Sequence, residues 1–338
     1  MDSITQIALG ASVATAVMGR KAGFRAPLWG AALGTLPDLD VLIPMGGAVA
    51  DFTYHRSFSH SLLVLAALSP ALSWLIRRCH PSLAHHRRSW LWMVLLVLLT
   101  HPLLDAFTIY GTQLLWPLDP TPVGLGSIFI IDPLYTLPLL LGCGLFLALR
   151  NNQRGLRANA VGLVLSSLYL LWSAVVQQHV EQRAHQQLGN SLQPHSRVLV
   201  QPAPFTTLLW RVLIVDANRY SIGFYALSDG DQPIQLRHYA NHESLLRTLD
   251  NHWPVERLRW FTKGFYSVRS SAEGVIMQDL RMGLEPDYVF QFKVAHWQDE
   301  QLIPITDERI PSQRSLHRLA PMWARIWRRP ADDQAPGF

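Results

Sequence analysis

The sequence predicts an α-helical membrane domain of about four to six membrane helices, followed by a small β-rich (α+β) soluble domain. Two observations lead to this prediction. Long apolar runs with few charged residues occupy the first half of the 338-residue chain. From about Gln177 onward the composition is that of a water-soluble protein, rich in Arg, Asp, Glu and Gln. The chain is also long enough for two domains of different character.

Six apolar segments of the first half are candidate membrane helices. A full span needs roughly 20 apolar residues, with a range of about 17–25. The last four segments meet or nearly meet this length, whereas the first two are short and rich in Gly and Ala, so a half-embedded hairpin is an alternative for them. The first segment begins with an acidic residue and its basic residues follow it, which indicates a retained helix and not a signal peptide. The segments are 3–18, 27–37, 59–76, 90–107, 131–149 and 158–177.

Basic residues occur in alternate predicted loops and so indicate the orientation. Ten of them lie after the first, third and fifth segments, whereas the loops at 38–58 and 105–132 contain only Arg56. By the positive-inside rule the basic loops face the cytoplasm. The N-terminus, the two other loops and the C-terminal domain are then outside, in the periplasm of a Gram-negative cell. The ten residues are Arg20, Lys21, Arg25, Arg77, Arg78, Arg87, Arg88, Arg150, Arg154 and Arg157.

The second half contains short segments in which apolar residues alternate and β-branched and aromatic residues are frequent. This pattern predicts strands, interrupted by one short helix at 242–250. We expect a membrane domain at 1–180, a β-rich extracytoplasmic domain at 190–305 and a basic, Trp-containing tail at 306–338. The tail is either an interfacial helix or a segment packed on its own domain. The predicted strands are 206–216, 219–228, 264–270, 274–280 and 288–295.

Several classes of protein are excluded by composition and motifs. The net charge of +5 does not indicate a nucleic-acid partner, because the arginines lie in short loops and in the last thirty residues. Cys79 and Cys143 are far apart and form no CxxC pair, which excludes a zinc knuckle and argues against a structural disulfide. The sequence contains no HExxH metalloprotease helix and no G-x-S-x-G elbow.

Acids and histidines collect on the predicted outer side, and imidazole with carboxylate is the ligand mixture of zinc and manganese sites. "HPLLD" is the strongest motif, because His101 and Asp105 are four residues apart and share one helical face. His101 follows a long apolar run, and an ionisable group at such a depth is costly and usually functional. A structural cross-link between two helices is the alternative for this pair.

Two further motifs on the same side supply candidates. "PDLD" places Asp38 and Asp40 after a proline turn, for which a polar helix end is the alternative. "HRSFSH" contains His55 and His60, which are five apart and share no helical face, so interface anchoring is the alternative to ligation. The histidines near His85 lie among arginines in a cytoplasmic loop and are interpreted as solvated.

The motifs "MDSITQIALG", "GTLPDLD", "HRSFSHSLL" and "THPLLDAFTIYGTQLLWP" resemble the bacterial family of inner-membrane, metal-dependent hydrolases of the LexA-regulated type. The resemblance continues through "FIIDPLYTLPLL" and more loosely into "LLWRVL", "FTKGFYSV" and "DLRMG", so it covers most of the chain. It implies a multi-pass protein of the inner membrane. The family is itself distantly similar to zinc-dependent phospholipases C, chiefly through the H-x-x-x-D pattern of His101 and Asp105.

Carried over residue by residue, the resemblance marks a set of metal-site candidates. Many family members have Thr-His where this chain has Thr5-Gln6, and glutamine is a weaker, neutral ligand, so the number of metals stays open. The marked residues are Asp38, Asp40, His55, His60, His101 and Asp105.

The predicted function is a membrane-embedded, metal-dependent hydrolase whose site opens at the outer face of the inner membrane. A divalent metal, with zinc favoured over manganese, would lower the pKa of bound water from 15.7 to about 7 and polarise an ester or phosphoryl oxygen. Asp40 or Asp51 is the candidate general base, and Arg56 the candidate partner of a phosphate. The expected substrate is a phosphoester or a lipid-linked compound of the bilayer. The alternative is a non-enzymatic assembly or envelope-stress protein in which a metal joins the helices and the β-rich domain binds a protein partner.

Overall fold

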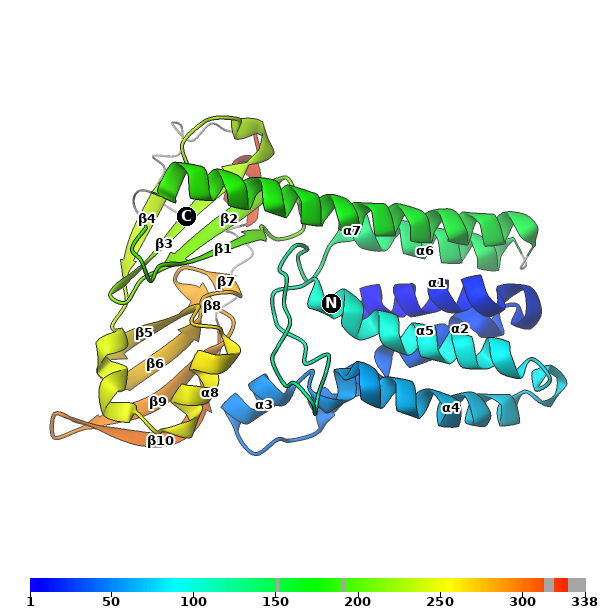
Figure 1. The fold of residues 1–338 in the computed structure, drawn as a ribbon, viewed down its shortest axis with the longest axis horizontal. Helices are drawn as coiled ribbons and strands as arrows, with labels where there is room; N and C mark the ends of the chain where they lie inside the picture. The colour runs from blue at the N-terminus through cyan, green and yellow to red at the C-terminus, as the bar shows by residue number, and fades with distance from the viewer. Residues whose placement is uncertain (150–151, 190–191, 313–318, 328–338) are drawn as a thin grey trace. The chain divides into compact units, whose positions relative to one another are not determined.

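The computed structural model describes residues 1–149, 152–189, 192–312 and 319–327 (Figure 1). Arg150 and the tail residues 313–318 and 328–338, on which part of the sequence prediction rests, lie outside the described residues. The chain divides into two compact units. The first comprises Met1–Ile43 and His55–Ala174, and the second comprises Pro44–Tyr54 and Val175–Phe338. The first is helical and the second contains antiparallel sheets, which confirms the predicted fold class.

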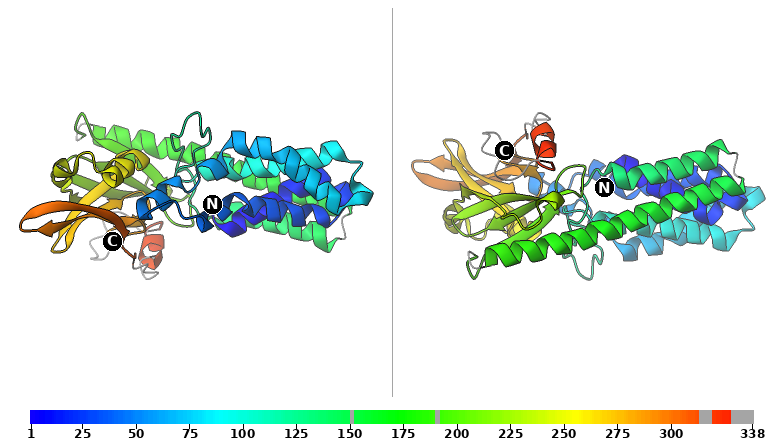
Figure 2. Two further views of the ribbon diagram at one scale, coloured as in Figure 1. Left: turned by 90° about the horizontal axis from the view of Figure 1, so that it is seen from below. Right: turned by 90° about the horizontal axis from the view of Figure 1, so that it is seen from above.

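The helices of the first unit run side by side (Figures 1 and 2). Each of the six predicted segments is helical. The first five have ends that differ by a few residues from the prediction, whereas the sixth, predicted at 158–177, starts five residues earlier and continues eleven residues further, to Leu188. Among the described residues, α4, α5 and α7 are long and apolar enough to cross a membrane, and α6 is a shorter apolar helix. The elements are α1 (Ser3–Ala22), α2 (Arg25–Thr35), η1 (Pro37–Leu42), η2 (Phe58–His60), α4 (Leu62–Cys79), η3 (Pro81–Leu83), α5 (Arg87–Ala106), α6 (Pro133–Ala148) and α7 (Gln153–Leu188), of which α7 ends in the second unit.

Glycines bring α1 and α2 together at backbone distance. A Cβ atom at Gly10 would lie 2.3 Å from the carbonyl oxygen of Gly30, and one at Gly34 would lie 2.6 Å from the carbonyl oxygen of Gln6. Small residues permit this approach between membrane helices, where tight packing supplies much of the association energy. The α1–α2 hairpin therefore places Gln6 beside Gly34.

Polar caps gather at one end of the first unit. Asp2 caps α1, Ser61 caps α4 and Asp132 caps α6, each accepting hydrogen bonds from the first turn of its helix. At the other end, Lys21 near the end of α1 donates a 2.5 Å hydrogen bond to Ser89 at the start of α5. Acidic caps and basic residues thus occupy opposite ends of the helices.

The second unit contains two four-stranded antiparallel sheets and a two-stranded one. The first has the order β1-β2-β3-β4 and the second the order β10-β9-β6-β5. All five predicted strands are present, as β2, β3, β5, β6 and β9, whereas the sheet-edge strands β1, β4 and β10 were not predicted. The strands are β1 (Arg197–Pro202), β2 (Leu209–Val215), β3 (Arg219–Ala226), β4 (Leu236–Ala240), β5 (Tyr266–Ser271), β6 (Gly274–Asp279), β7 (Gly283–Leu284), β8 (Asp287–Tyr288), β9 (Gln291–Gln298) and β10 (Gln301–Arg309).

Short helices complete the second unit. The predicted helix at 242–250 is the 3-10 helix η6 (Glu243–Leu249), and α8 (Trp253–Phe261) was not predicted. The tail helix α9 (Leu319–Ala324) packs on its own unit, because Met322 is fully buried and the Arg325 guanidinium forms two hydrogen bonds with Asp229. The described part of the tail therefore follows the second of the two alternatives considered for it. The 3-10 helix η5 (Leu227–Asp229) follows β3, and a further helix of this unit, α3 (Ala48–Tyr54), comes from the first half of the chain.

Candidate metal centre

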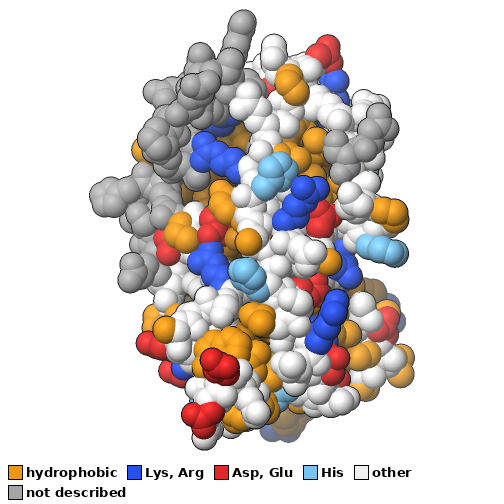
Figure 3. All heavy atoms as spheres, turned by 90° about the vertical axis from the view of Figure 1, so that its left-hand side faces the viewer, with side chains coloured by type: hydrophobic (Ala, Val, Ile, Leu, Met, Phe, Trp, Pro, Cys, Tyr) orange, Lys and Arg blue, Asp and Glu red, His pale blue; other side chains and the backbone are white. Residues whose placement is uncertain are grey.

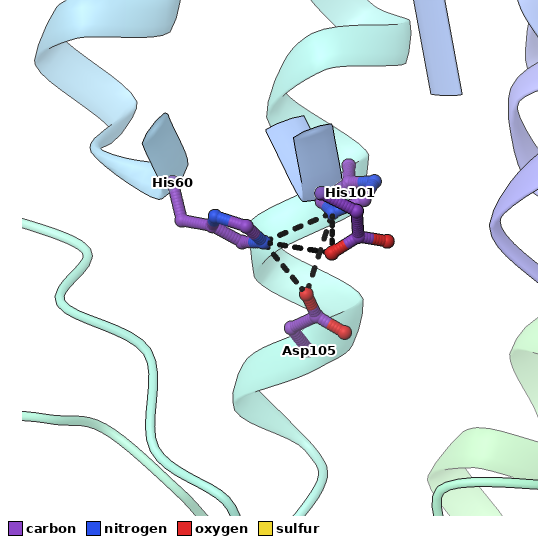
Figure 4. Close-up of side chains that lie close together, drawn as sticks. His60, His101 and Asp105 are labelled. Carbon is purple, nitrogen blue, oxygen red and sulfur yellow. Dashed lines mark hydrogen bonds and ion pairs between the residues drawn. The ribbon is translucent and has the colours of Figure 1, made fainter. Parts of the chain in front are cut away.

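Four of the predicted ligands converge at the capped end of the first unit. Asp38 comes from η1, His60 from η2, and His101 and Asp105 from successive turns of α5. Each offers one nitrogen or oxygen atom, and the four atoms all lie within 4.8 Å of one another. The two imidazoles and the Asp105 carboxylate face one another in Figure 4. His60, His101 and Asp105 are buried, whereas the Asp38 side chain is 23% exposed.

Five of the six distances among these atoms are close to those between the ligands of a tetrahedral metal ion. The His60 and His101 Nε2 atoms are 3.1 Å apart, and the Asp105 Oδ2 atom lies 3.2 Å from the first and 3.4 Å from the second. The Asp38 Oδ1 atom lies 3.4 Å and 3.5 Å from the same two nitrogens. Zinc bonds of about 2.0–2.1 Å in tetrahedral geometry imply ligand atoms roughly 3.3–3.4 Å apart. The five distances lie close to this value, and the sixth, between the two carboxylate oxygens, is within 4.8 Å.

The hydrogen bonds of the two imidazoles direct their lone pairs to the same point. His101 Nδ1 lies 2.7 Å from the carbonyl oxygen of Gly34, which can only accept, so Nδ1 carries a proton and, in the neutral ring, Nε2 has the lone pair. The Ser59 hydroxyl donates to Asp40 at 2.5 Å and therefore accepts from His60 Nδ1 at 2.9 Å. In the neutral His60 ring, the lone pair is then on Nε2 as well. A hydrogen-bond acceptor at the second ring nitrogen, here called an outer partner, is typical of metal-bound histidines.

The Oδ2 atom of the Asp105 carboxylate faces the Nε2 atoms of the two histidines, which lie 3.2 Å and 3.4 Å away. Among the described residues, its Oδ2 atom has no hydrogen-bond partner. Its Oδ1 atom is held by Gln6 Nε2 at 3.1 Å, by the Arg56 guanidinium at 3.4 Å and by the nitrogen of Met1. Two imidazole nitrogens and two carboxylate oxygens thus meet in one place, and a cation is the group that such a donor set accommodates.

Asp40 and His55, also predicted as ligands, lie beside the cluster and not within it. Asp40 accepts hydrogen bonds from His55 Nδ1 at 2.8 Å, from the Arg56 backbone at 3.0 Å and from the Ser59 hydroxyl. Its carboxylate therefore connects His55 to the Ser59 hydroxyl that orients His60. Burial opposes its charged form, but the hydrogen bonds from His55 and Ser59 outweigh burial and lower the pKa of Asp40.

Asp38 is also held in its charged form. Burial raises the pKa of this carboxyl, but hydrogen bonds from His101 and His60 and the charge of His101 outweigh it and hold the pKa well below the ordinary value. Asp38 is therefore a carboxylate at neutral pH and remains available to a cation.

The two other predicted catalytic residues have different surroundings. Arg56 is buried, with its guanidinium carbon 5.0 Å from the centre of the Tyr110 ring and its charge beside Asp105. Its backbone φ of 66° lies in the left-handed region, which non-glycine residues rarely adopt. Asp51 belongs to the second unit, where its carboxylate accepts a 2.6 Å hydrogen bond from the Met45 backbone.

Sequence reasoning missed several groups that hold the ligands in place. Ser59 was not among the predicted site residues, and Gln6 was considered only as the replacement of a histidine. The carbonyl of Gly34 carries no sequence signal as an acceptor. The small residues of the α1 and α2 segments were the sequence feature that could have indicated this carbonyl, because they permit the close packing of Gly34 against Gln6.

Comparisons with known proteins agree with the helical unit. Residues 1–180, more than half of the chain, match the family described as YdjM inner membrane protein. Uncharacterized protein YfhP of Bacillus subtilis (strain 168) is 25% identical over 190 residues, which are 55% of this chain and 54% of that protein. The chain thus matches about half the length of this relative. No solved structure matches the chain. The family match includes all four clustered residues and confirms the resemblance to a bacterial inner-membrane family, so the chain belongs to the YdjM inner membrane protein family.

Proposed function

We propose that this protein is a membrane-embedded, metal-dependent hydrolase that acts on a phosphoester or a lipid-linked substrate. The observation that carries the proposal is the group of two imidazole nitrogens and two carboxylate oxygens that lie within 4.8 Å of one another. Two nitrogen and two oxygen ligands at this spacing favour zinc over manganese, which prefers a larger set of oxygen ligands. Catalytic zinc sites keep three protein ligands and one open position. His60, His101 and Asp105 are the three most buried members and are suited to hold the ion.

When bound, the metal would supply an activated water and polarise a phosphoryl or ester oxygen. The residues of this chain would supply the remaining functions. Asp38 lies on the exposed side of the cluster, where its charged carboxylate could accept the proton of the attacking water. Asp40 already accepts three hydrogen bonds, which supports an orienting role for it in place of the predicted base. Arg56 balances the charge of Asp105, so we assign it to the metal ligand and not to the phosphate.

The position of the cluster along the helices supports a lipid-linked substrate. His60 directly precedes the cap of α4, and Asp105 lies in the last turn of α5, both of which are candidate membrane spans. The cluster therefore lies near the ends of two spans, at the depth of lipid headgroups. Val41 and Leu42 beside Asp38 are 71% and 76% exposed, which is typical of residues that contact lipid. The alternate basic loops favour the periplasmic side.

A non-enzymatic role is the second candidate, and the burial of three of the four ligands favours it. Structural zinc sites are closed by four protein ligands. In that case the metal would join η1, η2 and α5, and the second unit would bind a protein partner. The face of the second unit in Figure 3 carries intermixed positive and negative side chains, in contrast to the basic patch that nucleic-acid binding requires.

Metal analysis followed by activity assays separates the two candidates. The purified full chain is expected to contain zinc and to hydrolyse a soluble phosphodiester or a phospholipid in mixed micelles. A chelator should abolish turnover, and added Zn²⁺ should restore it. A protein that retains zinc but turns over neither substrate would support the structural role, and a protein without affinity for metal would refute both.

A further inference from the structure

The segment that carries Asp38 and the segment that carries His60 are connected by a loop that packs in the second unit. Residues 44–54 follow η1, which carries Asp38, and they precede His55 and the His60 turn. This loop clusters with the second unit, although both flanking segments belong to the first. The covalent bonds at its two ends, Ile43–Pro44 and Tyr54–His55, therefore join the metal ligands to the second unit.

The tip of the loop is anchored by an aromatic cluster. Phe52 of α3 is 5% exposed. The centre of its ring lies 4.8 Å from that of Phe261 in α8, and 4.3 Å and 5.3 Å from those of Phe290 and Phe292 near the start of β9. Ring pairs at such distances stabilise a fold beyond the burial of their area. The loop is therefore part of the core of the second unit.

Polar contacts hold the residues on either side of Phe52. Arg257 Nε donates a 2.9 Å hydrogen bond to the buried Thr53 hydroxyl. The Arg257 guanidinium carbon also lies 4.4 Å from the centre of the Tyr54 ring, next to His55. The backbone nitrogen of Val49 donates to the Asp307 carboxylate of β10. Backbone and side chains of the loop are thus both engaged by the second unit.

Hydrogen bonds beside the metal centre join the two segments that flank the loop. Asp40 accepts hydrogen bonds from His55 Nδ1 at 2.8 Å and from the Arg56 backbone at 3.0 Å. The segments that precede and follow the loop therefore lie close together. The same carboxylate accepts from Ser59, whose oxygen fixes the His60 ring. A change in the path of residues 53–56 would therefore be transmitted to His60 through Asp40 and Ser59.

We propose that the second unit positions the metal ligands through this loop, with Phe52 and Arg257 as positioning residues for His60 and Asp38. The inference rests on the proposed metal centre. It makes the β-rich unit a determinant of metal affinity, although none of the four clustered residues belongs to it. By linkage, metal binding must stabilise the anchored loop by the same free energy that the anchored loop contributes to metal binding.

The first test measures Zn²⁺ affinity of the full chain in detergent by competition with a chromogenic chelator. Phe52→Ala and Arg257→Ala should each weaken binding by roughly 10- to 100-fold, as changes to the outer partners of metal ligands do. Phe52→Leu, which retains most of the apolar volume, should restore most of the affinity. Met322→Ala is the matched control, because it empties a buried position of the same unit beside Ala203 and Leu209, away from the loop.

The outcomes distinguish this inference from the proposed centre. Wild-type affinity in a folded Phe52→Ala protein would overturn the positioning role. If the wild-type chain itself binds no Zn²⁺, the metal centre fails, and hydrogen exchange of the metal-free chain then tests the loop alone. Faster exchange at residues 55–61 in Phe52→Ala than in Met322→Ala would support the coupling. Equal exchange in the two variants would refute it.

Discussion

At the scale of single residues, the metal centre depends most directly on His101 and Asp105, which share a face of α5. His101→Ala removes a nitrogen lone pair, and Asp105→Asn replaces a charged oxygen ligand and leaves the buried Arg56 without its counter-charge. Both variants should still insert into the membrane. Their metal affinity should fall by more than the roughly 10- to 100-fold that results from changes to the hydrogen-bond partners of metal ligands. Metal content of the purified variants is the measurement. His85→Ala, at an exposed loop position, should bind as the wild type does. Full metal content in both site variants would identify the pair as a structural cross-link.

A second residue-scale prediction concerns Gly34, whose carbonyl orients His101. In Gly34→Ala the new Cβ would lie 2.6 Å from the Gln6 carbonyl oxygen, so α1 and α2 must separate. We expect a stability loss of about 1–3 kcal/mol and weaker zinc binding, because the acceptor of His101 Nδ1 moves. Thermal unfolding and zinc titration measure the two effects. Gly144→Ala is the matched control, since its Cβ would meet nothing within 4 Å. Equal behaviour of the two variants would show that the glycine contact does not support the centre.

At the scale of elements, the last turns of α7 belong to the core of the second unit. Val176, Val180, Ala184 and Leu188 pack with buried residues of the first sheet, including Trp210. A fragment that begins at residue 175 should therefore be soluble and show strand-dominated circular dichroism. One that begins at residue 195 should be less stable, because each fully buried Val or Leu side chain contributes roughly 1.5–3 kcal/mol. Neither fragment should bind zinc at the proposed centre, since all four clustered residues precede α6. Equal urea stability of the two fragments would contradict this role of α7.

At the scale of the whole molecule, the alternate basic loops predict the topology. A reporter that is active only in the periplasm should give signal when it is fused after Pro311. It should give none after His85, in the basic loop between α4 and α5. The opposite pattern would place the proposed centre at the cytoplasmic face. It would also exclude a periplasmic substrate for the hydrolase.

Much of this protein follows from its sequence, because the relevant signals are local. Apolar runs and alternating patterns distinguish the helical from the β-rich half, since both depend only on neighbouring residues. The pairing of His101 with Asp105 follows from the geometry of one helical turn, and the structure places both residues in the cluster. Two of the missed edge strands, β4 and β10, were harder to predict. Residues of β4 and β10 are largely exposed and lack the apolar alternation of a strand that is covered on one face.

Only the tertiary structure decided which candidates meet. Asp38 and Asp40 are two residues apart in η1, yet one faces the histidines and the other binds His55. His60 and His55 are divided in the same way. The direction of a side chain in a short 3-10 helix or a turn depends on the neighbours that pack against it, and these come from distant parts of the chain. The carbonyl of Gly34 and the anchoring of Phe52 have the same origin. Sequence spacing determines contacts within one helix, whereas contacts between separate segments depend on how the whole unit packs.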